Sequence, residues 1–364
     1  MEMDIQQYVL ERSQKMEKQT RAIQDHQVFD FNYIPEKPLM RQELQPIIDA
    51  ILKYEQTGIP SNVAIFGSRG SGKTLLVKYL MNLFQKKSLT LKYVNVRGTN
   101  TSFKIIAEIL EVQARGSSLS ELYHKFKKAF PRKTLVILDE VDLMSPKDKN
   151  RDILYFLSRD KNNYMTILLS NNPRFLAQLD TSTKSTLQPQ VIHFKNYNAQ
   201  QIYEILKDRA QKGLKRRNDT VLKHIAALTT QNTNSDVRVA LKTLFYFVTE
   251  PGTPVTESFE NARKDIYLDL LTDLNDKNLI LLKAVVESRD KLVKDVYQKY
   301  LRLSARVNDK AFSYVYFYNN LAYLQSIGLV LLSSAKVNRT YTNRITLTFD
   351  ESALESLYNL RFQL

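Results

Sequence analysis

The 364-residue chain carries 53 Lys and Arg against 38 Asp and Glu, a formal net charge of +15, and it contains no cysteine. The missing cysteine excludes disulfides, thiolate zinc sites, iron–sulfur clusters and a cysteine nucleophile. Hydrophobic residues make up 43% of the chain, which is enough for packed cores, and the length suggests two or three domains. The positive charge favours an anionic partner, with nucleic acid only slightly ahead of a merely lysine-rich surface.

The first 28 residues are polar, with weak helical periodicity, and predict a loosely held N-terminal arm rather than a signal peptide. From residue 62 onward, short apolar segments alternate with segments of helical spacing. The predicted strands are 62–66, 89–96, 134–138, 165–170 and 191–194, and the predicted helices among them are 74–85, 103–111 and 119–130. This alternation predicts a parallel, doubly wound α/β sheet.

Beyond Lys195 the pattern becomes helical, and a Pro/Gly-rich segment at 250–254 indicates a boundary. The predicted helices are 199–212, 219–229, 235–249, 269–288, 291–302 and 308–327. Two short apolar segments, 329–333 and 344–349, then predict a β-hairpin.

The most specific motif is Gly67-Ser-Arg-Gly-Ser-Gly-Lys-Thr74, which matches G-x-x-x-x-G-K-[ST] between a predicted strand and a predicted helix. Glycines let the backbone N–H groups converge on phosphate oxygens, and the helix adds its positive N-terminal end. Lys73 is expected to reach the β- and γ-phosphates, and the Thr74 hydroxyl to ligate Mg²⁺. The motif therefore predicts a nucleotide site.

Asp139 and Glu140 follow the apolar strand 134–138, at the end of a parallel strand where ligands bind in open sheets. We expect Asp139 to hold Mg²⁺ and Glu140 to polarise the attacking water. The alternative, a solvated strand end, is weakened by the preceding P-loop.

Two further polar groups are candidates for the same site. Asn171, with Asn172 second, follows strand 165–170 and is expected to orient the lytic water, although Asn also favours turns. Arg238, in a predicted lid helix, is expected to reach the γ-phosphate; on local sequence alone a surface arginine is an equal alternative.

These motifs together resemble the AAA+ ATPases, and more specifically the archaeal origin-recognition and cell-division-control initiator family. Asp30–Pro35 with Arg41 resembles the family's adenine-contacting segment, and 197–210 resembles the start of its lid. Leu274–Phe349 resembles its winged-helix domain. The resemblance covers roughly residues 28–350.

The resemblance implies an α/β P-loop AAA+ core with a parallel sheet, an all-α lid and a C-terminal winged-helix domain. The implied regions are an N-terminal arm at 1–28, the AAA+ domain at 29–195, the lid at 196–262 and the winged helix at 265–364. It implies ATP or ADP and Mg²⁺ as cofactors and weak ATPase activity that serves as a switch. The residues expected to bind the nucleotide are Tyr33, Ile34, Pro35, Arg41, Gly67, Ser68, Arg69, Gly70, Ser71, Gly72, Lys73, Thr74 and Tyr203.

The implied main partner is double-stranded DNA with origin-like sites, in a cytoplasmic, nucleoid-associated protein. Further implied partners are a paralogous initiator and the replicative helicase. Helix 308–327 would enter a major groove with its first residues, and the hairpin would contact a minor groove or phosphates. The residues expected to contact DNA are Lys310, Ser313, Tyr314, Lys336, Arg339 and Arg344, with Arg115 as a second contact from the AAA+ domain. The aromatic residues Tyr314, Tyr316, Phe317 and Tyr323 are expected to be core more often than contact.

One departure from the family concerns the arginine that acts on a neighbouring subunit's nucleotide. Ser182 stands at the expected arginine position, and Lys184 is the basic residue nearby. Lysine is a poorer bidentate partner than arginine, and such a finger contributes ~10³–10⁵ in rate. We therefore expect slow hydrolysis.

Two other functions remain open from the sequence. One is a DNA-targeting or regulatory AAA+ ATPase of a mobile element. The other is a nucleotide-switched regulator whose winged helix binds protein. A motor or clamp loader is disfavoured by Ser182 and by the appended winged helix.

Overall fold

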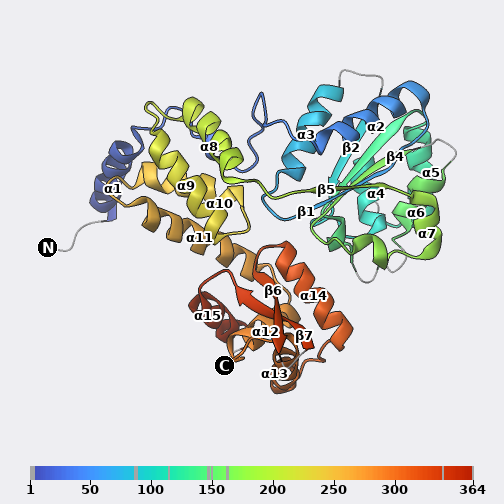
Figure 1. The fold of residues 1–364 in the computed structure, drawn as a ribbon. Coiled ribbons are helices and arrows are strands. Elements are labelled where there is room, and N and C mark those ends of the chain that lie inside the picture. The colour runs from blue at the N-terminus through green and yellow to red at the C-terminus, as the bar shows by residue number, and fades with distance from the viewer. Residues whose placement is uncertain are drawn as a thin grey trace. The chain divides into compact units, whose positions relative to one another are not determined.

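The structure, a computed structural model, describes residues 5–85, 89–113, 115–145, 148, 151–160, 164–337 and 340–362 (Figure 1). The chain divides into two compact units. Glu36–Lys195 forms one of them, and Met1–Pro35 together with Asn196–Leu364 forms the other. Among the residues described, no helix is both long and apolar enough to cross a membrane.

The unit at 36–195 is built on five parallel strands in the order β2–β3–β4–β1–β5 (Figure 1). The strands are β1 (Val63–Gly67), β2 (Thr90–Asn95), β3 (Thr134–Asp139), β4 (Met165–Ser170) and β5 (Gln190–Phe194). Strands β3 and β4 are buried along their whole length, as strands covered on both faces must be. The predicted parallel sheet is confirmed, with all five predicted strands present.

Helices cover both faces of this sheet. They are α2 (Leu44–Thr57), α3 (Lys73–Phe84), α4 (Ser102–Leu110), α5 (Leu119–Ala129), α6 (Asp152–Arg159) and α7 (Thr181–Leu187), with 3-10 turns η2 (Val141–Leu143) and η3 (Phe175–Gln178). Alternate strand residues such as Ile65 and Ile137 pack with α2 and α3, whereas Ala64 and Val136 pack with α4, α5 and α6. The result is a three-layer α/β/α sandwich.

The strand register brings the site together. Phe66 of β1 pairs with Ser170 of β4, and Leu138 of β3 pairs with Leu168 of β4. Because the three strands are parallel neighbours, their C-terminal ends lie at one edge of the sheet. The P-loop, the Asp139–Glu140 pair and Asn171 are therefore adjacent.

The second unit begins with α1 (Ile5–Thr20) and the 3-10 turn η1 (Gln27–Phe29), so the predicted loose arm contains a helix. A β-bridge between Ile23 and Leu214 joins this N-terminal segment to the end of α8. The helices that follow are α8 (Ala199–Gly213), α9 (Asp219–Asn232), α10 (Val237–Thr249) and α11 (Val255–Thr272).

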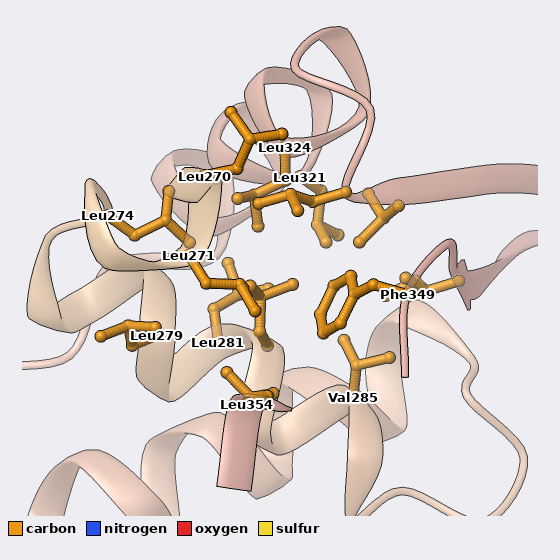
Figure 2. Close-up of a cluster of buried hydrophobic side chains, with 14 of the residues drawn as sticks. Leu270, Leu271, Leu274, Leu279, Leu281, Val285, Leu321, Leu324, Phe349 and Leu354 are labelled. Atoms are coloured by element: carbon orange, nitrogen blue, oxygen red, sulfur yellow. The ribbon is translucent and has the colours of Figure 1, made fainter. Parts of the chain in front are cut away.

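The C-terminal part consists of three helices, a two-stranded antiparallel hairpin and a last helix. These are α12 (Asp276–Val286), α13 (Val293–Arg306), α14 (Tyr314–Ser326), β6 (Val330–Val337), β7 (Thr340–Leu347) and α15 (Glu351–Phe362). Figure 2 shows leucines of α11, α12 and α14 packed with Phe349 and Leu354 in the core of this part. This helix–hairpin arrangement is that of a winged helix.

The predicted helix boundaries are most in error at two places. The single helix expected at 269–288 is two helices, because Asn275 caps the start of α12 by accepting a hydrogen bond from the Asn278 N–H. The helix expected from residue 308 begins at Tyr314, and the Phe312 N–H is instead bound to the Tyr300 hydroxyl.

The expected boundary between lid and winged helix falls inside α11. Phe259, near the start of that helix, and Leu271, near its end, belong to one continuous apolar cluster with the winged-helix core. The separation of these two regions as domains stays a prediction.

Candidate functional site

The P-loop lies between the end of β1 and the start of α3. Gly70 and Gly72 have positive φ angles of 73° and 85°, in the left-handed region that glycine tolerates best. A Cβ on Gly67 would lie 2.8 Å from the Phe194 carbonyl oxygen. The loop therefore needs glycine at these positions, and its backbone leads directly into the positive end of α3.

Lys73 is buried and its ammonium group is surrounded by oxygen acceptors. It donates to the carbonyl oxygens of Gly67 and Ser68, each at 2.8 Å, and to the Asn171 Oδ1 at 2.9 Å. The Lys73 ammonium group thus contacts both the P-loop and the tip of β4. Phosphate oxygens can replace these acceptors when a nucleotide binds.

Asp139 ends β3 with its carboxylate buried next to the P-loop. Its Oδ2 accepts hydrogen bonds from the Thr74 hydroxyl and the Tyr93 hydroxyl, both at 2.8 Å. Burial raises the pKa of Asp139, although the hydrogen bonds from Thr74 and Tyr93 oppose the shift. A hydroxyl and a carboxylate this close are the hard oxygen donors that Mg²⁺ takes, so these residues fit the ion.

Glu140 follows with a positive φ of 55°. Its Oε2 accepts a hydrogen bond from the Nε of Arg97 at 2.9 Å, in a partly exposed ion pair. Arg97 follows a different strand, β2, so this partner was not predicted from the sequence.

Asn171 and Asn172 have different roles at the tip of β4. The Asn171 amide oxygen reaches Lys73, whereas the Asn172 Oδ1 accepts a hydrogen bond from the Arg174 N–H and closes a local turn. The backbone N–H of Asn171 donates to Asp142. Of the two asparagines, Asn171 is thus the one that lies at the site.

Three residues around this site were not singled out from the sequence. Tyr93 contacts Asp139, Arg97 contacts Glu140, and Asp142 contacts Asn171. For Asp142 a signal was present, since Asp-Glu-Val-Asp places another carboxylate two residues after Glu140. Tyr93 and Arg97 are brought in by the β2–β3 register, which a single sequence does not specify.

Arg41 is buried, and its guanidinium contacts the protein itself. It donates to the Ser71 carbonyl oxygen at 2.9 Å and to the Lys195 carbonyl oxygen at 2.7 Å, and it pairs with Glu43. These contacts brace the P-loop from behind. Direct contact of Arg41 with a nucleotide stays a prediction.

The other expected nucleotide contacts belong to the second unit. The segment Tyr33–Pro35 is held by Arg209 of α8, whose guanidinium carbon lies 4.4 Å from the Tyr33 ring centre and which donates to the Tyr33 carbonyl oxygen. Tyr203, also on α8, is buried, with the ammonium groups of Lys207 and Lys223 over its ring.

Arg238 lies in the first turn of α10, two residues after Asp236, which caps this helix. Its Nε donates to the Asp236 Oδ1 at 2.9 Å, and a second guanidinium nitrogen pairs with the Asp236 Oδ2. The Arg238 N–H also donates to Asp236. One carboxylate therefore both caps α10 and holds the arginine.

The first turn of α14 presents three exposed side chains. Tyr314, Val315 and Tyr316 are 42%, 70% and 60% exposed, while Phe317 is fully buried. The expectation that these aromatic residues are core is right for Phe317 and wrong for Tyr314 and Tyr316. The helix start thus offers an aromatic, solvent-facing surface.

The remaining DNA candidates occupy exposed positions around this helix. Ser313 is the N-cap of α14, and Lys310 lies in the loop before it. In the hairpin, Lys336 is exposed beside Tyr341, and Arg344 is exposed on β7. Arg339 lies outside the described residues. Arg115 is exposed in the turn before α5.

The segment that carries the arginine finger in the resembled family forms α7. Ser182 is exposed there, and the Lys184 ammonium donates to the Ala177 carbonyl oxygen at 2.9 Å. The nearby lysine is thus engaged within its own segment.

Residues 60–179 match the AAA domain family. The ORC1-type DNA replication protein 1 of Sulfolobus acidocaldarius is 32% identical over 232 residues, which are 58% of this chain and 58% of that protein. The ORC1-type DNA replication protein of Desulfurococcus amylolyticus is 28% identical over 357 residues, which are 88% of this chain and 89% of that protein.

Two solved structures share the fold across nearly the whole chain. The Aeropyrum pernix ORC1 protein in complex with DNA has a TM-score of 0.66 at 22% identity and covers 93% of this chain and 97% of its own. The Aeropyrum pernix ORC2 protein, in ADPNP–ADP complexes, has a TM-score of 0.66 at 22% identity and covers 94% and 98%. With an AAA domain match over residues 60–179 and relatives that are ORC1-type DNA replication proteins, the chain is similar to the archaeal origin-recognition and cell-division-control family of AAA+ ATPases.

Proposed function

We propose that this protein is a replication initiator that binds ATP and specific double-stranded DNA and hydrolyses ATP slowly as a switch. The observation that carries the nucleotide part is the contact of Lys73 with Asn171 beside the contact of Thr74 with Asp139. These contacts unite the P-loop with the tips of two neighbouring strands. The ORC1-type relatives support the replication role.

At the nucleotide, the P-loop backbone and Lys73 bind the β- and γ-phosphates. Thr74 and Asp139 would hold Mg²⁺, which supplies charge neutralisation at the phosphates when bound. Glu140 accepts the proton of the attacking water, and Asn171 orients that water. Arg238 binds the γ-phosphate from the lid, so the presence of that phosphate biases the geometry of the lid.

At the DNA, the first turn of α14 reads base edges in the major groove, and the hairpin contacts the minor groove or phosphates. The exposed Tyr314, Val315 and Tyr316 support the first role, because apolar and hydroxyl groups discriminate base edges. The exposed Lys336 and Arg344 support the second. Arg115 adds a contact from the AAA+ domain. Paralogous initiators and the replicative helicase are the further partners.

The test maps bound DNA genome-wide for the wild type and for Lys73→Ala, followed by footprinting on duplex DNA. We expect a few discrete sites, ATP-dependent protection, and affinity that falls with salt. Lys53→Ala is the control, because Lys53 is an exposed lysine on α2. Absence of protection and of salt dependence would favour a protein-binding winged helix.

A further inference from the structure

Asp142 is a buried carboxylate in the turn η2, two residues after Glu140, and the roles described above do not use its side chain. Its Oδ1 accepts hydrogen bonds from the Ser170 hydroxyl at 2.7 Å and from the Asn171 N–H at 3.0 Å. Its Oδ2 is buried and has no hydrogen-bond partner within the part of the chain that the structure describes. A half-satisfied buried carboxylate costs stability, so a purely structural residue would be expected to do better with an apolar or fully paired side chain.

The two hydrogen-bond donors to the Asp142 Oδ1 suggest a role for this residue. Ser170 and Asn171 form the tip of β4, and the Asn171 amide oxygen lies 2.9 Å from the Lys73 ammonium. Asp142 itself sits in the turn that Glu140 begins. A single oxygen atom therefore ties the segment carrying the candidate proton acceptor to the segment carrying the candidate water-orienting amide.

We propose that Asp142 is a positioning residue for ATP hydrolysis, which fixes Asn171 relative to Glu140 through hydrogen bonds accepted by one carboxylate oxygen. The proposal rests on the proposed function, since it assumes hydrolysis at this site. Asp142 acts through Asn171. Its loss should therefore lower the rate of the chemical step more than the affinity for ATP, because misplacement of reacting groups by about 1 Å can cost about 10²-fold in rate.

The orphan oxygen makes a discriminating substitution available. In Asp142→Asn the amide oxygen can accept both hydrogen bonds, and the amide nitrogen takes the place of the unpartnered oxygen. In Asp142→Ala both bonds are lost. Ser170→Ala removes one of the two donors and leaves the bond from the Asn171 N–H, without changing the carboxylate. Because the Ser170 hydroxyl also accepts a hydrogen bond from the Asn172 N–H, this variant is compared with Asp142→Ala rather than interpreted by itself.

A matched control lies on the same strand. Thr166 is buried in β4, where its hydroxyl donates to the Asn62 Oδ1 at 3.0 Å, far from the strand tip. Thr166→Val removes a hydrogen bond that is buried like those of Asp142. This variant should have a lower thermal midpoint and an unchanged kcat. It separates general weakening of the sheet from loss of position at Asn171.

The experiment measures kcat, the affinity for a fluorescent ATP analogue and the thermal midpoint of each full-length variant. For Asp142→Ala we expect kcat to fall about 10- to 100-fold while nucleotide affinity changes less than about threefold. Ser170→Ala should show a smaller loss in kcat, and Asp142→Asn should stay within about threefold of the wild type. Unchanged kcat in Asp142→Ala, or a joint loss of affinity and thermal midpoint that Asp142→Asn does not restore, would overturn the proposal.

A structural readout keeps this test separate from the proposed function. In protein labelled with ¹⁵N-asparagine, the side-chain amide signal of Asn171, assigned with Asn171→Ala, should move in Asp142→Ala and keep its position in Asp142→Asn. If the wild type shows no hydrolysis, the proposed function fails while this signal still reports on Asn171. An unmoved signal in Asp142→Ala rejects the positioning role by itself.

Discussion

The Nε of Arg97 lies 2.9 Å from the Oε2 of Glu140, so the candidate proton acceptor is paired with a cation from the turn after the neighbouring strand β2. The Arg97 side chain is 41% exposed and the Glu140 side chain 20%. An ion pair this exposed contributes about 0–1 kcal/mol, because solvent screens it. Breaking this ion pair therefore costs little free energy.

Replacing Arg97 with methionine should raise ATP hydrolysis severalfold, because the carboxylate of Glu140 is released to accept the proton of the water. The gain should stay well below the ~10²–10⁴ that a general base contributes. Phosphate release under saturating ATP measures it. Arg132→Met, at an exposed position before β3, is the control, and Glu140→Gln should abolish the activity in either background. A fall in rate on Arg97→Met would mean that Arg97 assists hydrolysis.

Arg238→Ala should leave ATP binding largely intact and reduce hydrolysis, because the arginine would act on the γ-phosphate. Nucleotide affinity and phosphate release, measured on the same preparation, separate the two effects. Loss of the folded state in this variant would instead make Arg238 structural.

Asp236 variants provide the matched controls for that result. Asp236→Ala removes both the ion pair and the helix cap, and loss of a cap costs about 0.5–2 kcal/mol. Asp236→Asn keeps a capping oxygen and removes the charge that holds Arg238. We expect Asp236→Asn to retain the thermal midpoint of the wild type, and Asp236→Ala to lower it.

The grouping of side chains at the candidate site was largely predictable from sequence, because each of its parts is a local motif. The P-loop, the pair Asp139–Glu140 and Asn171 each follow an apolar strand, and parallel strands carry their C-terminal ends to one edge. Arg97 and Asp142 were not predicted as parts of the site, since their contacts depend on strand order and on the turn geometry after β3.

Elements with weak local signals were also missed. Helix α7 consists largely of Thr and Ser, which are poor helix formers, and it depends on its cap by Asp180. In α14, periodicity placed four aromatic residues in one stretch, but the helix start at Tyr314 decides which of them face solvent. Only tertiary packing decides that Phe317 is buried and Tyr316 is exposed.

That difference in α14 gives a direct test of the winged helix. Tyr316→Ala should leave stability nearly unchanged and weaken binding to specific DNA, because the side chain is exposed in the first turn. Phe317→Ala should lower the free energy of unfolding by about 3–5 kcal/mol, since a fully buried aromatic ring is removed. Denaturant unfolding measures the free energy of unfolding, and DNA titrations at two salt concentrations measure the affinity for DNA. Equal DNA affinity for Tyr316→Ala and the wild type would remove this helix turn from the interface.

Hydrolysis by the wild type should be slow and independent of protein concentration, because Ser182 offers no charge to a neighbouring subunit's nucleotide. Arginine fingers contribute ~10³–10⁵ in rate, so even a poorly placed arginine should be measurable. We therefore expect Ser182→Arg to introduce hydrolysis that rises with protein concentration. Ser182→Lys should do less, because lysine lacks the bidentate geometry.

Lys184→Ala should change nothing, since its ammonium is bound to the Ala177 carbonyl oxygen. Rapid, concentration-dependent hydrolysis by the wild type would show that another residue supplies the charge in trans, and α7 would then not be the segment that lost it.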